Sequence, residues 1–229
     1  MTEGLSLLAG ARWVLIWLGF MLLYTFLDVA VWRRIAPRGE KYLHLAAMVL
    51  CMAAFLALLR AKAGFVPDLS AGVTPGALLL ALVCALALYL LLDRGLDPFF
   101  ERLFPGSEKG YQETLRTLGA APVISLIQVC VLAPVMEEVL MRGFLLEGLS
   151  VRYGGGTALA VSAVLFALLH FNMVQTLSAL VCGVVLGLLY LRTGALLCCV
   201  VTHMGYNLIS YCTAILPLVK GKGATGQAI

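Results

Sequence analysis

The sequence predicts an all-α protein, a polytopic bundle of about seven to eight transmembrane helices. Hydrophobic residues make up 62% of the 229-residue chain and charged residues only 12%, and the mean hydropathy is +1.01. Apolar stretches close to the roughly 20 residues that a helix needs to cross a bilayer recur along the chain. These observations leave no room for a separate soluble domain, and they predict a single membrane domain.

Seven apolar stretches are assigned as spans in chain order. The first is too long for a removable signal peptide and is interpreted as a retained anchor. The fourth is long enough to break into two helices, which would make eight. The spans are 13–32, 42–59, 75–92, 119–149, 157–172, 174–191 and 195–218. We divide the domain into N-terminal helices with a cytoplasmic interfacial segment, a motif-bearing bundle and a polar tail, at 1–118, 119–218 and 219–229.

The interfacial segment lies in the long connection 93–118. Apolar residues recur there at helical spacing between charged ones, at Leu96, Phe99, Phe100, Leu103 and Phe104. This pattern predicts a short helix lying in the plane of the lipid headgroups. Such a helix could guide a membrane-bound substrate toward a site, or it could be a simple connector.

The placement of Lys and Arg predicts the topology. Ten of these residues flank the connections after the first, third and last spans, at 33, 34, 38, 41, 94, 102, 109, 116, 220 and 222. Five occupy the alternate connections, at 12, 60, 62, 152 and 192. The positive-inside rule therefore puts the C-terminus and the connection 93–118 in the cytoplasm. With an odd number of spans, the N-terminus lies outside.

Several residues receive structural interpretations only. The seven cysteines all fall within the spans without CxxC spacing, which favours free thiols that fill small apolar gaps. Gly183 and Gly187 are expected to allow close helix packing. Asp28 can extend toward water near the end of its span, and His44 is interpreted as interfacial. Tyr206 could line a cavity or simply pack, and packing is favoured.

Two adjacent acids, Glu137 and Glu138, stand inside an apolar run together with Arg142. Ionisable groups at membrane depth are costly, so they are functional hypotheses by default. Glu138 and Arg142 are four residues apart and face the same way on a helix, whereas Glu137 is rotated by about 100°. We therefore expect Glu138 to be held as an ion pair. The unpaired Glu137 would be free to take a proton from water and later return it.

Two histidines and an asparagine are the expected partners of this acid. His203 and Asn207 are four residues apart on one helical face. Counting residues from the turns near 154–156 and 192–194 brings Glu137, His170, His203 and Asn207 to similar depth in the membrane. The spacing thus permits one shared site in its cytoplasmic half.

These motifs resemble those of the type II CAAX prenyl endopeptidase group, also called the CPBP or Abi family of intramembrane proteases. The family patterns Glu-Glu-x-x-x-Arg, Phe-x-x-x-His and His-x-x-x-Asn/Asp match 137–142, 166–170 and 203–207 in order and spacing. The resemblance covers about 119–213, and Met141 departs from the aromatic residue that the family often has there.

The resemblance implies roles for the six motif residues in endoproteolysis. Glu137 and His170 would activate water, and Glu138 with Arg142 would hold the first acid in place. His203 and Asn207 would stabilise the oxyanion at the scissile carbonyl.

The family is commonly labelled a metalloprotease, and Glu137, His170 and His203 have side chains of the types that bind Zn. A metal-free glutamate mechanism explains the same residues, so Zn dependence stays open.

Three classes of function remain. The first is an intramembrane endopeptidase that acts on a membrane-associated peptide or protein. The second is a non-catalytic immunity or sensor-regulating membrane protein of the same family. The third, a transporter or proton relay, would show interrupted half-helices in matching repeats, which are not found. We expect the lipid bilayer and the substrate as partners, no nucleic acid, and a multi-pass location in a bacterial cell membrane. The sequence does not indicate whether the substrate is lipidated.

Overall fold

The computed structural model describes residues 4–224, and every regular element within them is helical. In chain order the elements are α1 (Leu7–Leu27), η1 (Asp28–Trp32), α2 (Arg33–Ile35), α3 (Glu40–Ala63), α4 (Pro75–Leu91), η2 (Leu92–Leu96), α5 (Asp97–Leu103), α6 (Pro105–Leu118), α7 (Pro122–Ile127), η3 (Gln128–Leu132), α8 (Ala133–Glu138), η4 (Val139–Leu146), α9 (Glu147–Tyr153), α10 (Gly155–Leu168), α11 (Met173–Thr193) and α12 (Leu196–Ala224). The elements named η are π-helical turns. The predicted all-α class is therefore confirmed.

Six helical stretches within the described chain are long and apolar enough to cross a membrane: Leu7–Ile35, Glu40–Ala63, Pro75–Leu103, Pro122–Tyr153, Met173–Thr193 and Leu196–Ile215. Each contains or overlaps a predicted span. Local signals set several of their ends. The side chains of Ser6 and Thr74 accept hydrogen bonds from backbone N–H groups of the first turns of α1 and α4, as N-caps do. Glycines with positive φ, Gly64 and Gly194, terminate α3 and α11.

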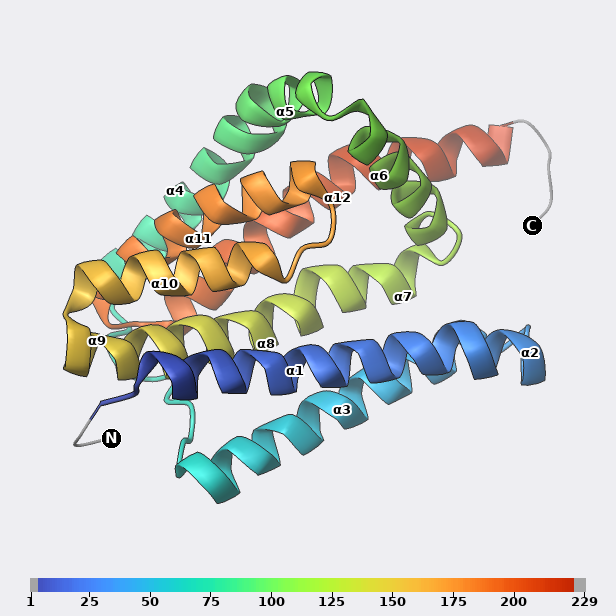
Figure 1. The fold of residues 1–229 in the computed structure, drawn as a ribbon. Helices are drawn as coiled ribbons and strands as arrows, with labels where there is room; N and C mark the ends of the chain where they lie inside the picture. The colour runs from blue at the N-terminus through green and yellow to red at the C-terminus, as the bar shows by residue number, and fades with distance from the viewer. Residues whose placement is uncertain (1–3, 225–229) are drawn as a thin grey trace.

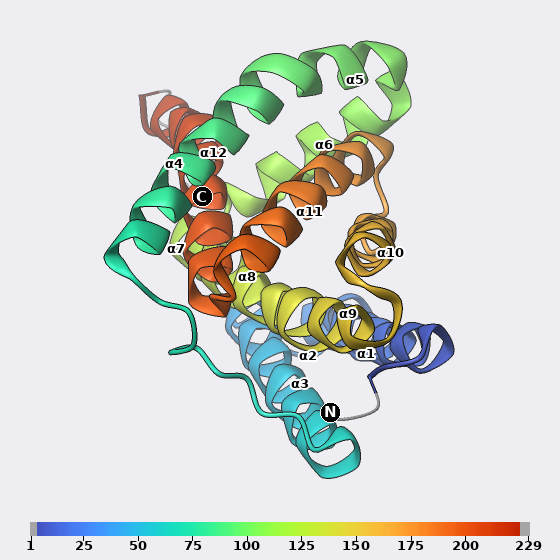
Figure 2. The same ribbon diagram turned by 90° about the vertical axis from the view of Figure 1, so that its left-hand side faces the viewer.

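The bundle is organised around the long helix Pro122–Tyr153, which we call the motif helix because it carries Glu137, Glu138 and Arg142. In Figures 1 and 2, α1 and α3 lie side by side along one flank of this helix. On the other flank α10 packs against α11, and α12 packs against α4. Every residue of η4 is buried, so the centre of the protein lies at this stretch of the motif helix.

The motif helix is continuous, so the alternative of a break into two helices is not realised. Two π-helical turns, η3 and η4, flank α8 instead. Pro134 provides a physical reason for the first of them. Proline lacks an N–H group, and its ring clashes with the carbonyl of the preceding helical turn. The backbone hydrogen-bond pattern of the α-helix therefore widens to a π-helical turn there. At 32 residues this helix is about 48 Å long, which requires tilt in a bilayer about 30 Å thick.

The predicted span 157–172 is wrong in its extent. The helix formed there, α10, has 14 residues, or about 21 Å, and is too short to cross a bilayer alone. It ends because Asn172 begins α11, with its Oδ1 accepting from the N–H groups of Val174 and Gln175. As a result His170 lies in a short loop between two helices.

The predicted helix 96–104 is also corrected. Residues 92–103 continue α4 through η2 and α5 without interruption, so α5 is not a separate helix. The separate helix of this connection is α6. Together α5 and α6 (residues 97–118), which we call the covering segment, arch over one side of the bundle (Figure 1). The Asn172 Nδ2 donates to the Ser107 carbonyl over 2.7 Å, and the Ser178 hydroxyl donates to Asp97. The covering segment is thereby fastened to α11.

The two ends of the bundle match the predicted distribution of basic residues. Figure 1 shows α2, the turn between α6 and α7, and the described end of α12 at one end, and α9 with the start of α10 at the other. The predicted tail 219–229 begins inside α12, which runs to Ala224, and 225–229 lie outside the described residues.

Small residues allow close packing, as predicted. A Cβ at Gly183 would lie 3.2 Å from the Ala163 Cα, and a Cβ at Gly187 would lie 2.3 Å from Leu159 Cδ1. The tightest approach to backbone is at Gly72 in the loop before α4. It has φ +66°, and a Cβ there would lie 2.4 Å from the Thr193 carbonyl oxygen. This loop therefore packs directly on the turn between α11 and α12.

We predict that Gly72→Ala lowers the melting temperature in detergent more than Gly64→Ala does. Both positions have positive φ, which costs an alanine roughly 1–2 kcal/mol, but a Cβ at Gly64 meets nothing within 4 Å. The clash at Gly72 adds about 1–3 kcal/mol of overpacking. Equal melting temperatures for the two variants would show that the contact with the α11–α12 turn does not contribute to stability.

Candidate active site

A cavity of about 290 Å³ lies between the motif helix, the covering segment, α11 and α12. Four of the six predicted site residues line it: Glu137, His170, His203 and Asn207. They come from four separate places in the bundle, namely α8, the loop after α10, and two successive turns of α12. The other two predicted residues, Glu138 and Arg142, do not line the cavity and lie fully buried beside it.

The predicted ion pair between Glu138 and Arg142 is present. Arg142 Nη1 donates to Glu138 Oε1 over 2.9 Å, with side chains 1% and 0% exposed. Arg142 Nη2 also donates to the Gly183 carbonyl over 3.0 Å. The pair uses one oxygen and one nitrogen only. Glu138 Oε2 and Arg142 Nε are buried and have no hydrogen-bond partner among the described residues.

A second contact of Glu138 was not predicted. Its Oε1 also lies 2.9 Å from His203 Nδ1, on a helix 65 residues further along the chain. Because a carboxylate accepts, Nδ1 carries the hydrogen, and the ring presents Nε2 to the cavity. That nitrogen lies 3.8 Å from Glu137 Oε2. His203 is thus placed between the two acids, and no local sequence signal could have indicated this.

His170 is oriented in a similar way. Its Nδ1 lies 3.1 Å from the carbonyl oxygen of Phe166, one helical turn earlier. A carbonyl oxygen can only accept, so this nitrogen is the donor, and in the neutral imidazole Nε2 then has the lone pair. Thr176 donates from its hydroxyl to the His170 carbonyl, which fixes the loop. Both histidines therefore use Nδ1 for anchoring and keep Nε2 for other partners.

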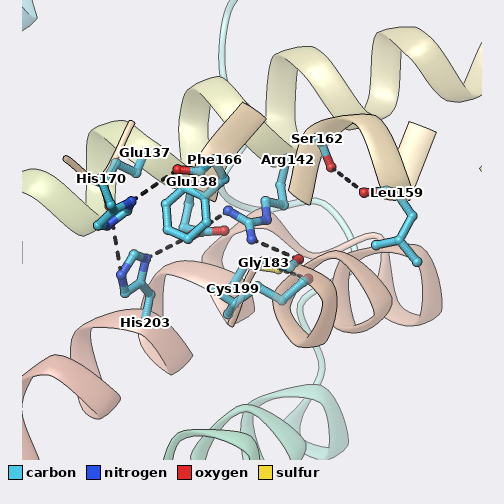
Figure 3. Close-up of polar contacts among 11 residues, drawn as sticks. Glu137, Glu138, Arg142, Leu159, Ser162, Phe166, His170, Gly183, Cys199 and His203 are labelled. Carbon is cyan, nitrogen blue, oxygen red and sulfur yellow. Dashed lines mark hydrogen bonds and ion pairs between the residues drawn. The ribbon is translucent and has the colours of Figure 1, made fainter. Parts of the chain in front are cut away.

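Phe166 lies at the centre of this group (Figure 3). Its ring is 1% exposed, and the Arg142 Cζ lies 4.9 Å from its centroid. The rings of His170 and His203 pack on it at 5.1 and 5.8 Å in edge-to-face arrangements. The sequence indicated Phe166 only as the first letter of a motif, without a role.

Asn207 lines the cavity but is partly committed elsewhere. Its Nδ2 donates to the Val129 carbonyl in η3 over 2.8 Å, which leaves one amide hydrogen and Oδ1 for another partner. Tyr206 also lines the cavity and packs against the core, so both interpretations left open by the sequence apply. Tyr111 on α6 completes this side, and burial raises the pKa of its phenol, so it is a neutral donor.

The geometry offers little support for a metal. Within residues 4–224, no three His, Cys, Asp or Glu side chains are grouped so that they could hold an ion. His203 Nε2 is directed toward Glu137 at ion-pair distance, while the His170 ring packs on Phe166. As they lie, Glu137, His170 and His203 do not fit a zinc site.

The third histidine lies apart from the cavity. His44, expected to be simply interfacial, has its Nδ1 3.8 Å from Asp28 Oδ1, and Asp28 in turn pairs with Arg33 at 3.1 Å. Asp28 is therefore paired with Arg33 near the end of its span, and His44 Nδ1 lies near it without a hydrogen bond to it. Neither Asp28 nor His44 lines the cavity.

Comparison with known proteins supports the interpretation of the site. Residues 119–209 match the family model described as Type II CAAX prenyl endopeptidase Rce1-like. No curated protein and no solved structure matches the chain. The matched segment runs from just before the motif helix into α12, and it contains all six predicted site residues. Over residues 119–209 the chain is therefore similar to the Rce1-like family of type II CAAX prenyl endopeptidases.

Proposed function

We propose that this protein is an intramembrane endopeptidase that cleaves a membrane-associated peptide or protein with a water molecule activated by Glu137. The observation that carries the proposal is the shared cavity. Glu137, His170, His203 and Asn207 line it, while the neighbouring Glu138 is paired behind it with Arg142. In this arrangement Glu137 is free to react, while Glu138 and Arg142 hold it in place.

Glu137 is the proposed general base. Its side chain is 16% exposed, whereas that of Glu138 is 0% exposed and already accepts from Arg142 and His203. Of the two acids, only Glu137 can therefore reach a water molecule in the cavity. His170 Nε2, which has a lone pair, would accept the second hydrogen of that water and orient it toward the substrate.

His203 and Asn207 are proposed to stabilise the oxyanion. For this role His203 must carry hydrogens on both nitrogens. The carboxylates of Glu138 and Glu137 lie 2.9 and 3.8 Å from its two nitrogens. In this doubly protonated form, the positive charges of Arg142 and His203 balance the two neighbouring carboxylates. The free amide hydrogen of Asn207 supplies a second donor.

The proposed reaction balances without a metal. The water oxygen forms a bond to the scissile carbonyl carbon as its proton passes to Glu137. Collapse of the tetrahedral intermediate breaks the C–N bond, and Glu137 returns the proton to the leaving nitrogen. The products are a carboxylic acid and an amine, and Glu137 is ready for another cycle.

We propose a bacterial cell membrane as the location, with the cavity in its cytoplasmic half. In support, the covering segment next to the cavity belongs to the connection that is rich in Lys and Arg. The described end of α12 lies at the same end of the bundle as the turn that follows α6 (Figure 1).

We predict that Glu137→Gln lowers cleavage of membrane peptides by about 10²–10⁴-fold with little change in melting temperature, because it removes only the base. Glu147→Gln is the matched control, since Glu147 is exposed on the same helix and bonds to Tyr190. Product masses from purified protein in bilayers give the rates. Undiminished cleavage by Glu137→Gln would remove it as the base. A wild-type protein that cleaves no candidate peptide yet keeps a membrane partner would support the non-catalytic alternative.

Arg142→Ala should lower both cleavage and stability. It leaves Glu138 without its partner in a dry environment, which costs on the order of 3–5 kcal/mol of unfolding free energy. Arg33→Ala is the control, because Arg33 is 54% exposed and its pair with Asp28 is worth about 1 kcal/mol at most. Denaturant titrations in detergent measure both. If Arg142→Ala were no less stable than Arg33→Ala, Glu138 would not depend on this pair.

His203→Ala distinguishes the two chemistries left open by the sequence. On the proposed mechanism it removes an oxyanion donor and lowers kcat by about 10²–10³-fold, and a chelator leaves wild-type cleavage unchanged. Metal analysis after dialysis should find less than one ion per chain in the wild type. One zinc per chain that disappears in His203→Ala, together with chelator-sensitive cleavage, would replace this mechanism by a metal-dependent one.

A further inference from the structure

The ion pair at the centre of the site is held at a single point. Only Arg142 Nη1 and Glu138 Oε1 are in contact, and the remaining atoms, Arg142 Nε and Glu138 Oε2, have no partner among the described residues. A two-bond pair fixes the relative orientation of guanidinium and carboxylate, whereas a one-bond pair leaves rotation about the contact. Other groups must therefore set the orientation of Arg142.

Two further contacts of the guanidinium are seen. One is the hydrogen bond from Nη2 to the Gly183 carbonyl, and the other is the face of the Phe166 ring, with Cζ 4.9 Å from its centroid. The face of an aromatic ring is negative and attracts a cation, most strongly where water is excluded. Arg142 and Phe166 are each 1% exposed, so this contact is dry.

The position of the Phe166 ring is itself fixed by packing. Gly183 on α11 has no side chain, and a Cβ there would lie 3.2 Å from Phe166 Cδ1. On other sides the ring meets His170 and His203. Figure 3 shows the ring between His170 and Arg142. Because the Phe166 ring is packed on these sides, its face can set the orientation of the Arg142 guanidinium.

We propose that Phe166 is a positioning residue: the face of its ring holds Arg142 so that Glu138 Oε1 is directed at His203 Nδ1. The hydrogen bond from His203 to Glu138, at 2.9 Å, fixes the imidazole, and its Nε2 then faces Glu137 and the cavity. The catalytic consequence rests on the proposed peptidase function. The contact between Phe166 and Arg142 does not.

Fluorination of the ring tests this inference, because each added fluorine weakens the negative face while shape and volume change little. Phenylalanines with one, two and three fluorines are introduced at position 166 by nonsense suppression. We expect kcat to fall stepwise, by about 10-fold or more for the trifluoro ring, with KM unchanged. Phe144 is the matched control. It is fully buried on the same motif helix as Arg142, and its ring packs on Trp13 and Phe65. Fluorination there should leave kcat unchanged.

A stability measurement tests the contact without any substrate. The fluorinated series at 166 should lower the melting temperature stepwise in the wild-type background. The series is repeated in a Glu138→Gln/Arg142→Met background, which removes both partners of the buried pair and so avoids an isolated charge. There the stepwise decrease should vanish, as a double-mutant cycle requires of a direct contact.

The outcomes separate the two proposals. If the wild type cleaves no peptide, the proposed function fails, and the melting series still decides whether Phe166 holds Arg142. A kcat that does not change across the series at 166 overturns the positioning role, even if the melting temperatures couple to Arg142. Equal losses of kcat at 166 and 144 would overturn it as well, because the effect would then be a general one of fluorinated cores.

Discussion

The structure depends on one requirement, which is the burial of the Glu138 carboxylate at the centre of an apolar bundle. An isolated carboxylate there would be very costly, so its charge has to be balanced by donors that are equally buried. Arg142 comes from the next turn of the same helix, and His203 comes from α12. Arg142 in turn needs the Gly183 carbonyl, which requires α11 to approach closely. One acid therefore links the motif helix to α11 and α12, and the cavity forms where these helices meet.

The irregular parts of the fold serve the same arrangement. The π-helical turns on either side of α8 change the direction in which side chains leave the motif helix, and such turns are frequent at functional sites. The Val129 carbonyl in η3 accepts from Asn207. The short α10 ends where its loop can bring His170 to the cavity. A full-length span in its place would have carried residue 170 onward as part of a helix.

Local patterns in the sequence were sufficient for much of this structure. Apolar windows predicted the long spans, and the four-residue spacing of Glu138 and Arg142 predicted their contact, because both properties depend on neighbours along one helix. Counting residues from the turns also predicted a similar depth for four polar residues. In the structure these four line one cavity: Glu137, His170, His203 and Asn207. The contact of Glu138 with His203 and the approach of His44 to Asp28 were not predicted. Each depends on how separate helices are rotated against one another, and apolar periodicity is weak in helices surrounded by lipid. The end of α10 at Leu168 lies four residues before the predicted end at 172.

Asn172 has a mechanical consequence. Its Oδ1 caps α11, and its Nδ2 holds the Ser107 carbonyl at the start of α6. Two residues before it in the chain lies His170, whose carbonyl accepts from Thr176 in the first turn of α11. A force applied to α6 from outside would therefore be transmitted through one amide group to the loop that carries a cavity histidine. The covering segment and that histidine cannot be displaced independently while this amide keeps its hydrogen bonds to α6 and to α11.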